Sequence, residues 1–125
     1  MYCAYGETVP KAIVIGSSTP DYSFFADDTS IKDGKIYETL WSEDEISDFI
    51  KNNNPVNNLQ RFYSISILSG NNINDPKITY KGSESLEQKL RGVNNDIHFY
   101  YYDISGHDVP ETFVQKMLPF IKERL

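Results

Sequence analysis

The feature that most constrains this chain is the run Ala12-Ile13-Val14-Ile15-Gly16, which is apolar, rich in β-branched residues and closed by glycine. Such a run suits a strand that is buried on both faces, as in a parallel sheet covered by helices. Two further runs with strand patterns follow, Phe62 to Gly70 and Ile97 to Tyr102. The chain is therefore expected to form a sheet with a layer of helices on each face.

Helical patterns separate these strands. The spacing of apolar residues predicts helices over residues 36–41, from Ser42 to the asparagines before Pro55, over 85–93, and from 108 or 109 to the end of the chain. Ser42 and Glu45 have the form of a capping box. Pro119 is expected to bend the last helix or to end its first part. This order predicts one α/β domain over residues 1–125, with three layers and a mostly parallel sheet.

Composition narrows the class of partner. The 125 residues carry a formal charge of −6, which argues against nucleic acid, because phosphate binding needs clustered Lys and Arg. The single cysteine allows no internal disulfide, and no apolar stretch is long enough to span a membrane. The N-terminus lacks the pattern of a signal peptide, so a soluble, cytoplasmic protein is favoured. The acidic clusters do not match a calcium loop, and we expect neither a metal nor a cofactor.

One histidine lies where catalytic groups often lie. Ser105-Gly106-His107-Asp108 follows the last predicted strand and precedes the last predicted helix. Functional side chains of open α/β sheets gather at the carboxyl ends of the strands. A histidine there can serve as a general base, because its pKa is close to physiological pH. The other histidine, His98, lies within a strand pattern and is expected to be a packed or surface residue.

The stretch Tyr100 to Pro110, with the aromatic final helix behind it, resembles the catalytic-histidine loop of α/β-hydrolases, in particular of their serine esterase branch. Ile13 to Ser18 resembles the strand that follows the nucleophile helix in that family, and Phe62 to Gly70 resembles the strand that carries the triad acid. The resemblance implies the C-terminal portion of a larger hydrolase fold that acts on carboxylic esters, with His107 in the position of the base.

The resemblance also implies an acid to orient His107. Asp75 is the only carboxylate within reach of Gly70, although it comes slightly later than the usual spacing. Alternatively, Asp75 only begins a turn before Pro76. Asn72 is nearer, but it has no charge with which to stabilise an imidazolium.

No nucleophile motif is present. The sequence contains no Gly-x-Ser-x-Gly elbow, and Ser17 and Ser18 precede Thr19-Pro20, where proline does not suit a sharp turn into a helix. The resemblance assigns both serines to the strand after the elbow. We therefore expect no efficient catalysis by the chain alone, because a triad without its nucleophile loses nearly all its rate advantage.

Other functions remain open. Tyr22, Phe25 and Trp41 are candidates for a substrate cleft that binds a small ester, or equally for the core. The alternative to an esterase is a non-catalytic α/β interaction module or an oligomerising fragment. The partner would then be a missing N-terminal half or a second copy of the chain, bound at an exposed sheet edge beside residues 13–15.

Overall fold

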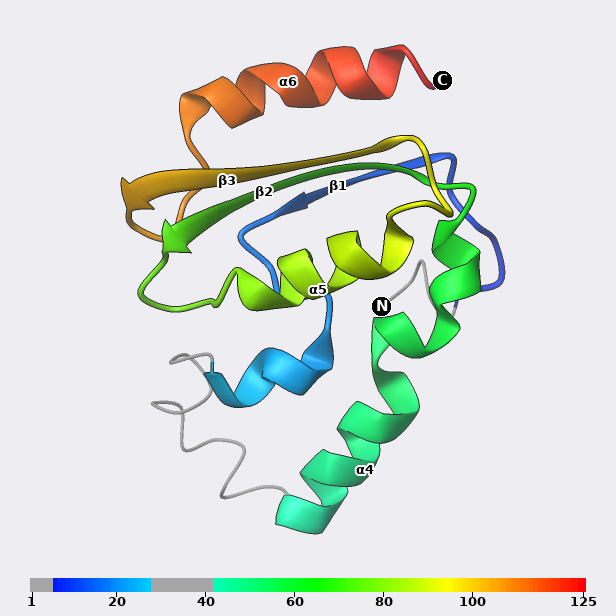
Figure 1. Ribbon diagram of the computed structural model, residues 1–125, viewed down its shortest axis with the longest axis vertical. Coiled ribbons are helices and arrows are strands. Elements are labelled where there is room, and N and C mark those ends of the chain that lie inside the picture. Colours follow the sequence, from blue (N-terminus) through cyan, green and yellow to red (C-terminus); the bar gives the residue numbers. More distant parts are fainter. Residues whose placement is uncertain (1–5, 28–41) are drawn as a thin grey trace.

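The sheet has three strands, β1 (Ala12–Gly16), β2 (Ser66–Asn74) and β3 (Ile97–Ser105), in a computed structural model that describes residues 6–27 and 42–125 (Figure 1). They lie in the order β1-β2-β3, and both neighbouring pairs are parallel. The predicted α/β class with a parallel sheet is confirmed. The helix predicted over residues 36–41 lies outside the described residues.

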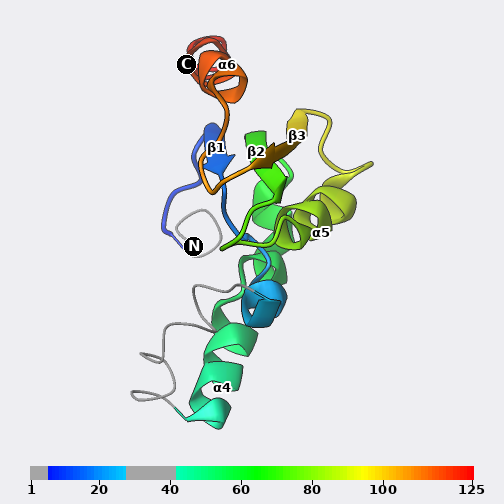
Figure 2. The ribbon, with the colours of Figure 1, turned by 90° about the vertical axis from the view of Figure 1, so that its left-hand side faces the viewer.

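Helices cover both faces of this sheet. Helix α5 (Lys81–Leu90) lies on one face and α6 (Glu111–Lys122) on the other, as the views along and across the strands show (Figures 1 and 2). Three further elements lie on the α5 side: η1 (Tyr22–Asp27), α4 (Glu43–Asn53) and η2 (Pro55–Phe62). The predicted three layers are therefore present.

Each interface between layers has its own apolar core, and β2 contributes to both because its side chains alternate. Ile67 faces α5, where it packs with Ile65, Leu86 and Leu90. Leu68 faces α6, where the buried partners are Phe113 and Phe120. This explains why β2 shows a continuous buried stretch from Ile67 to Asn72 rather than an alternation of buried and exposed residues.

Gly70 in β2 is required by the packing of α6. A Cβ atom at Gly70 would lie 2.5 Å from Cδ2 of Phe113, closer than real Cβ contacts allow. The fully buried ring of Phe113 therefore rests directly on the backbone of the central strand. This contact sets the distance between α6 and the sheet.

The boundaries of β2 and α5 correct the sequence prediction. The strand expected over Phe62 to Gly70 begins at Ser66 and continues to Asn74. Phe62 instead ends η2 and is buried in the core on the α5 side, and Gly70 lies inside the strand. Helix α5 begins at Lys81, earlier than the expected Ser85, and ends at Leu90.

Two predictions concern the other helices. Ser42 and Glu45 form the predicted capping box at the start of α4. Helix α6 continues through Pro119 to Lys122, so of the two alternatives given for Pro119 the ending of the helix is wrong. Proline at 119 removes the hydrogen bond to the carbonyl of Gln115, but both residues are exposed, so water can satisfy that carbonyl.

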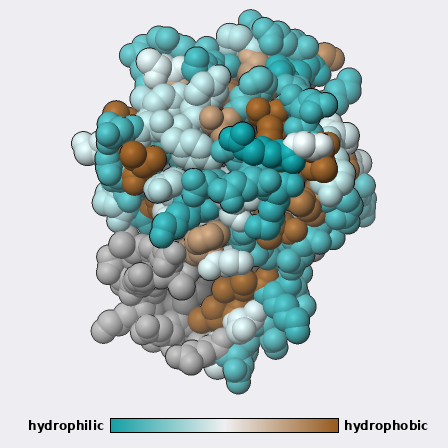
Figure 3. Space-filling view, in the orientation of Figure 1, coloured by the Kyte–Doolittle hydropathy of each residue, from teal (hydrophilic) through white to brown (hydrophobic). Residues whose placement is uncertain are grey.

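The surface has no single large apolar area on the face shown in Figure 3, where brown patches alternate with hydrophilic side chains and one of them lies over α4. Among the described helices, none is long and apolar enough to cross a membrane.

A buried carboxylate joins the loop after β1 to α4 and α5. The side chain of Asp21 is only 4% exposed. Its Oδ1 accepts hydrogen bonds from Asn54 Nδ2 at 2.9 Å and from the Ser23 amide at 3.1 Å. Its Oδ2 accepts one from Ser85 Oγ at 2.6 Å and pairs with Lys89 Nζ at 3.3 Å. Burial raises the pKa of Asp21, but these hydrogen bonds outweigh it and lower the pKa from 3.8 to about 2.

We predict that Asp21 makes folding stability sensitive to acid. Because its pKa is lower in the folded than in the unfolded chain, its contribution is complete above about pH 4 and is lost as the pH falls through about 2. Asp21→Asn should lower the free energy of unfolding at neutral pH by roughly 2 kcal/mol and flatten its fall in acid. Urea unfolding at several pH values measures this. Asp48→Asn, at an exposed position of α4, is the control. Equal acid sensitivity of the Asp21→Asn variant and the wild type would contradict the prediction.

Candidate active site

The loops after β2 and β3 bring Asp75 and His107 together. Both loops leave the carboxyl ends of parallel strands, which point to the same side of the molecule (left in Figure 1). His107 Nδ1 lies 2.9 Å from Asp75 Oδ2. Because β2 extends to Asn74, Asp75 directly follows the strand and is not late, as counting from Gly70 suggested. The role of the pair in catalysis stays a prediction.

The surroundings of Asp75 keep it ionised. Its side chain is 2% exposed, and its Oδ1 accepts hydrogen bonds from the amides of Lys77 at 2.8 Å and Ile78 at 3.0 Å. Burial of the carboxyl raises its pKa, but the Lys77 amide, the His107 ring and the Ile78 amide together lower the pKa of Asp75 below its usual 3.8. An ionised Asp75 can only accept, so Nδ1 of His107 carries the proton and Nε2 of the neutral ring has a free lone pair.

His107 opens onto a small cavity at the end of β1. The cavity has a volume of about 240 Å³ and is lined by Gly16, Ser17, His107, Asp108 and Val109. The His107 side chain is 38% exposed, so its ring is accessible while Asp75 is not. This is the arrangement that a general base requires: one ring nitrogen is held by a buried carboxylate and the other can be reached by a reactant.

Ser17 does not complete a triad. It has a φ of 41°, the only positive φ outside glycine among the described residues, and its amide donates to the carbonyl of Gly70 at 3.0 Å. Its Oγ is buried and makes no hydrogen bond to His107 or to any other described residue. A hydroxyl hidden from solvent is poorly placed to attack a substrate, which agrees with the expectation that the nucleophile lies elsewhere.

The predicted aromatic cleft is not part of this site as far as the structure describes it. Tyr22 stacks on Phe49 of α4, with ring centroids 6.3 Å apart, and does not line the cavity beside His107. The side chain of Phe25 and all of Trp41 lie outside the described residues. Within residues 6–27 and 42–125, no three His, Cys, Asp or Glu side chains gather in a way that could hold a metal ion.

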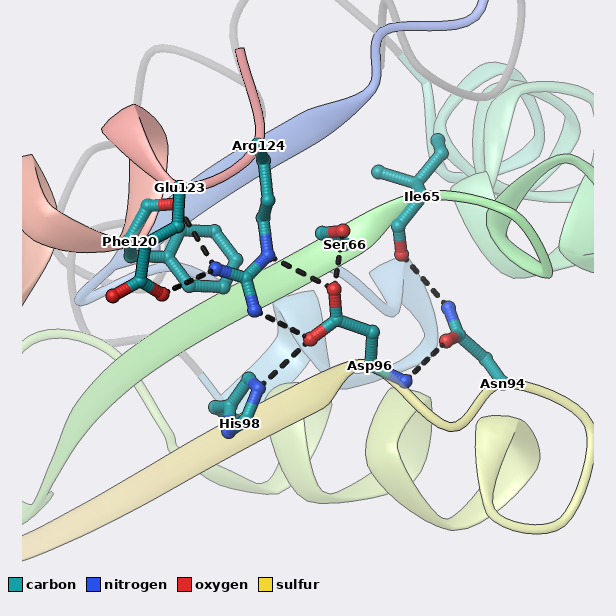
Figure 4. Close-up of polar contacts among 8 residues, drawn as sticks. All are labelled: Ile65, Ser66, Asn94, Asp96, His98, Phe120, Glu123 and Arg124. Atoms are coloured by element: carbon teal, nitrogen blue, oxygen red, sulfur yellow. Dashed lines mark hydrogen bonds and ion pairs between the residues drawn. The ribbon is translucent and has the colours of Figure 1, made fainter.

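The other histidine forms a second pair with different surroundings. His98 Nε2 lies 2.9 Å from Asp96 Oδ1, near the amino end of β3 (Figure 4). Both oxygens of Asp96 are bound by Arg124, through Nη2 at 2.6 Å and Nε at 2.9 Å, and Ser66 Oγ donates to Oδ2. The Arg124 hydrogen bond is the largest cause of the lowered pKa of Asp96. This cluster ties the end of α6 to the sheet and provides a matched control for His107.

Sequence reasoning missed one residue of the site. Asn72, judged above only as a poor substitute for an acid, binds the backbone of the His107 loop through Nδ2, at 3.1 Å from the carbonyl of Gly106 and 2.6 Å from that of Asp108. An asparagine near the end of a predicted strand was the only signal in the sequence that pointed to Asn72. Its hydrogen-bond partners lie more than thirty residues away, so the sequence did not reveal them.

The fold is an α/β fold with a parallel sheet between two layers of helices, and a histidine–aspartate pair lies at the carboxyl ends of its strands. Comparison with solved structures finds similarity to the Pyrococcus furiosus esterase Pf2001, with a TM-score of 0.56 and 18% identity. The match covers 98% of this chain and 47% of the esterase, so the chain spans about half the length of that protein. At this identity the likeness concerns the fold alone. No protein-family model matches the sequence, and no curated protein is significantly similar to it.

We predict that the pKa of Asp75 depends on His107. His107→Ala removes a hydrogen bond and a charge interaction that both lower the pKa of Asp75, so this pKa should rise, while the Lys77 and Ile78 amides keep part of the effect. Carboxyl ¹³C chemical shifts followed through an acid titration measure it. In the control His98→Ala, the pKa of Asp96 should rise and that of Asp75 should not move. An unchanged Asp75 titration in His107→Ala would show that the 2.9 Å contact does not persist in solution.

Proposed function

We propose that this chain supplies the base and its orienting acid to the active site of a serine-type carboxylic ester hydrolase of the α/β-hydrolase class. The observation that carries the proposal is the hydrogen bond between His107 Nδ1 and the buried Asp75, located at the carboxyl ends of parallel strands. The fold shared with an esterase supports the same reaction class. The substrate class is a small carboxylic ester.

The proposed chemistry assigns His107 two proton transfers in each half of the reaction. Nε2 accepts the proton of a serine hydroxyl as its oxygen attacks the ester carbonyl, and then gives that proton to the departing alcohol. Asp75 keeps the ring in the required tautomer and stabilises the imidazolium that forms between these steps. In the second half of the reaction, water attacks the acyl-serine, His107 takes a proton from that water, and it then gives the proton to the serine oxygen as the carboxylic acid leaves.

The serine is proposed to come from another part of a complete hydrolase fold, as the resemblance implies. The sequence has no Gly-x-Ser-x-Gly turn, and the hydroxyl of Ser17 is buried. The chain alone would then show only the weak reactivity of a well-oriented imidazole toward activated esters.

We predict that this weak reactivity depends on His107 and not on His98. With p-nitrophenyl acetate, the rate above the buffer rate should fall roughly tenfold in His107→Ala and less in Asp75→Asn. His98→Ala should change it by less than about twofold, although His98 also pairs with an aspartate. Release of p-nitrophenol at 400 nm, with circular dichroism to verify folding, gives the comparison.

Two results would contradict this proposal in different ways. Equal rates for His107→Ala and the wild type would remove His107 as the base. A burst of one equivalent of p-nitrophenol with an acylated serine in the intact mass would place the nucleophile within this chain.

A second candidate function is self-association through the outer edge of β1, favoured by the bare backbone of that strand. The carbonyl of Lys11 and the amide of Ser17 form hydrogen bonds with β2. Because backbone groups alternate in direction along a strand, the N–H and C=O groups of Ala12, Val14 and Gly16 point outward, where no described strand pairs with them. None of the five residues of β1 is charged and none is proline, so the edge lacks the usual protection against pairing.

One flank of α6 is suited to a second copy. Val114 and Leu118 are 49% and 60% exposed on one face of α6, and Ile121 on the same side lines a cavity with Ala12 of β1 and with Leu125. Glu111 in the first turn and Lys122 in the last turn border this face. A two-fold axis would set two copies of α6 antiparallel and bring the acidic end of each near the basic end of the other.

We predict that Leu118→Glu weakens a dimer of this chain by at least about tenfold, because a charged side chain would replace an apolar one at the interface. Lys116→Gln changes the net charge by the same one unit on the opposite flank of α6, where Lys116 lies over the ring of Tyr100, and should have little effect. Sedimentation equilibrium over a range of concentrations measures both. A wild-type chain that stays monomeric at every concentration of the series would contradict self-association.

A further inference from the structure

Asn72 lies at the carboxyl end of β2, next to the site but outside the histidine–aspartate pair. Its residue is 1% exposed, and its register partner in β3 is Tyr102. Its Nδ2 donates to the carbonyl of Gly106 at 3.1 Å and to that of Asp108 at 2.6 Å. These two residues flank His107. We infer that Asn72 is the positioning residue of the site, holding the His107 loop so that the ring meets Asp75; this inference rests on the proposed function.

Both hydrogen bonds act on the backbone of the loop and not on the ring. The chain leaves β3 at Ser105 and turns at Gly106, whose φ of 107° is open to glycine and strained for other residues. Asn72 Nδ2 binds the carbonyl of the residue before His107 and the carbonyl of the residue after it. The backbone is therefore held on both sides of His107. Loop residues are mobile unless their backbone groups are bonded, so this clamp limits the positions available to the imidazole.

The same residue also sets the position of the acid. The amide of Asp75 donates to the carbonyl of Asn72 at 3.3 Å, which closes the turn after β2. The backbone of Asn72 thus anchors the turn that presents Asp75, while its side chain anchors the loop that presents His107. One residue of the central strand determines the separation of the two catalytic-type groups, which have to remain within hydrogen-bond distance to act together.

A matched residue separates positioning from general packing. Asn71 precedes Asn72 in β2, is 2% exposed, and also has a buried Oδ1 that makes no hydrogen bond among the described residues. Its Nδ2 donates to Ser69 Oγ at 3.1 Å and not to the His107 loop. The two amides are alike in burial and in strand, and differ in what their Nδ2 groups hold.

The test compares Asn72→Leu with Asn71→Leu, because leucine has the same number of side-chain heavy atoms and the same branching at Cγ as asparagine, and no donor. The readout is the imidazole Nδ1–H signal of His107 and its exchange with solvent, recorded by ¹⁵N-resolved NMR on the full chain at neutral pH. His98 provides an internal reference in each spectrum. We expect Asn72→Leu to lose this signal or to speed its exchange at least about tenfold, and Asn71→Leu to leave it unchanged.

Each outcome decides the inference. An unchanged His107 signal in Asn72→Leu overturns it, and so does an equal loss in Asn71→Leu, which would assign the effect to packing. Should Asn72→Leu not fold, Asn72→Ala with the control Asn71→Ala makes the same comparison without added volume. The NMR readout requires no ester turnover: loss of the signal in Asn72→Leu combined with full activity of His107→Ala would support the positioning and refute the proposed function.

Discussion

The contact of Phe113 with Gly70 is the constraint on which the rest of the structure depends. It allows α6 to lie directly on the central strand, with Phe120 and Leu68 completing that core. Because α6 begins at Glu111, its position also decides where the preceding loop can run. Packing in the core therefore brings His107 to the end of β2, and the hydrogen bonds of Asn72 refine its position. A side chain at Gly70 would move the helix and, with it, the loop.

The two histidine–aspartate pairs have the same separation but different surroundings. Both pairs are 2.9 Å apart. Asp96 is shared among Arg124, Ser66 and His98 and is 42% exposed, so its charge is largely neutralised by a cation. Asp75 is buried, its Oδ1 accepts from two backbone amides, and its Oδ2 is paired with the His107 ring. One oxygen of this carboxylate is therefore directed at the imidazole, as stabilising an imidazolium requires.

Local patterns were sufficient for part of this structure. The apolar run at Ala12 to Gly16 identified β1, and Ser42 with Glu45 identified the start of α4, because both signals involve neighbours in the chain. Gly70 was misread as the end of a strand, because the reason for a glycine there is the ring of Phe113, which lies far along the sequence. That error made Asp75 look displaced. Asn72 could not be assigned either, since a buried amide reveals its role only through its partners.

The outer edge of β1 links the two candidate functions and also makes them compete. His107 opens toward Gly16 and Ser17, at the carboxyl end of β1, so a nucleophile for it has to arrive at that end of the sheet. A strand that pairs with β1 in the parallel sense ends at the same side and can present a serine there. A second copy related by a two-fold axis pairs in the antiparallel sense and has its own carboxyl ends at the opposite side. Self-association at this edge would therefore occupy the place of a nucleophile-bearing strand, and a dimer of this kind would leave His107 without the hydroxyl that its geometry suits.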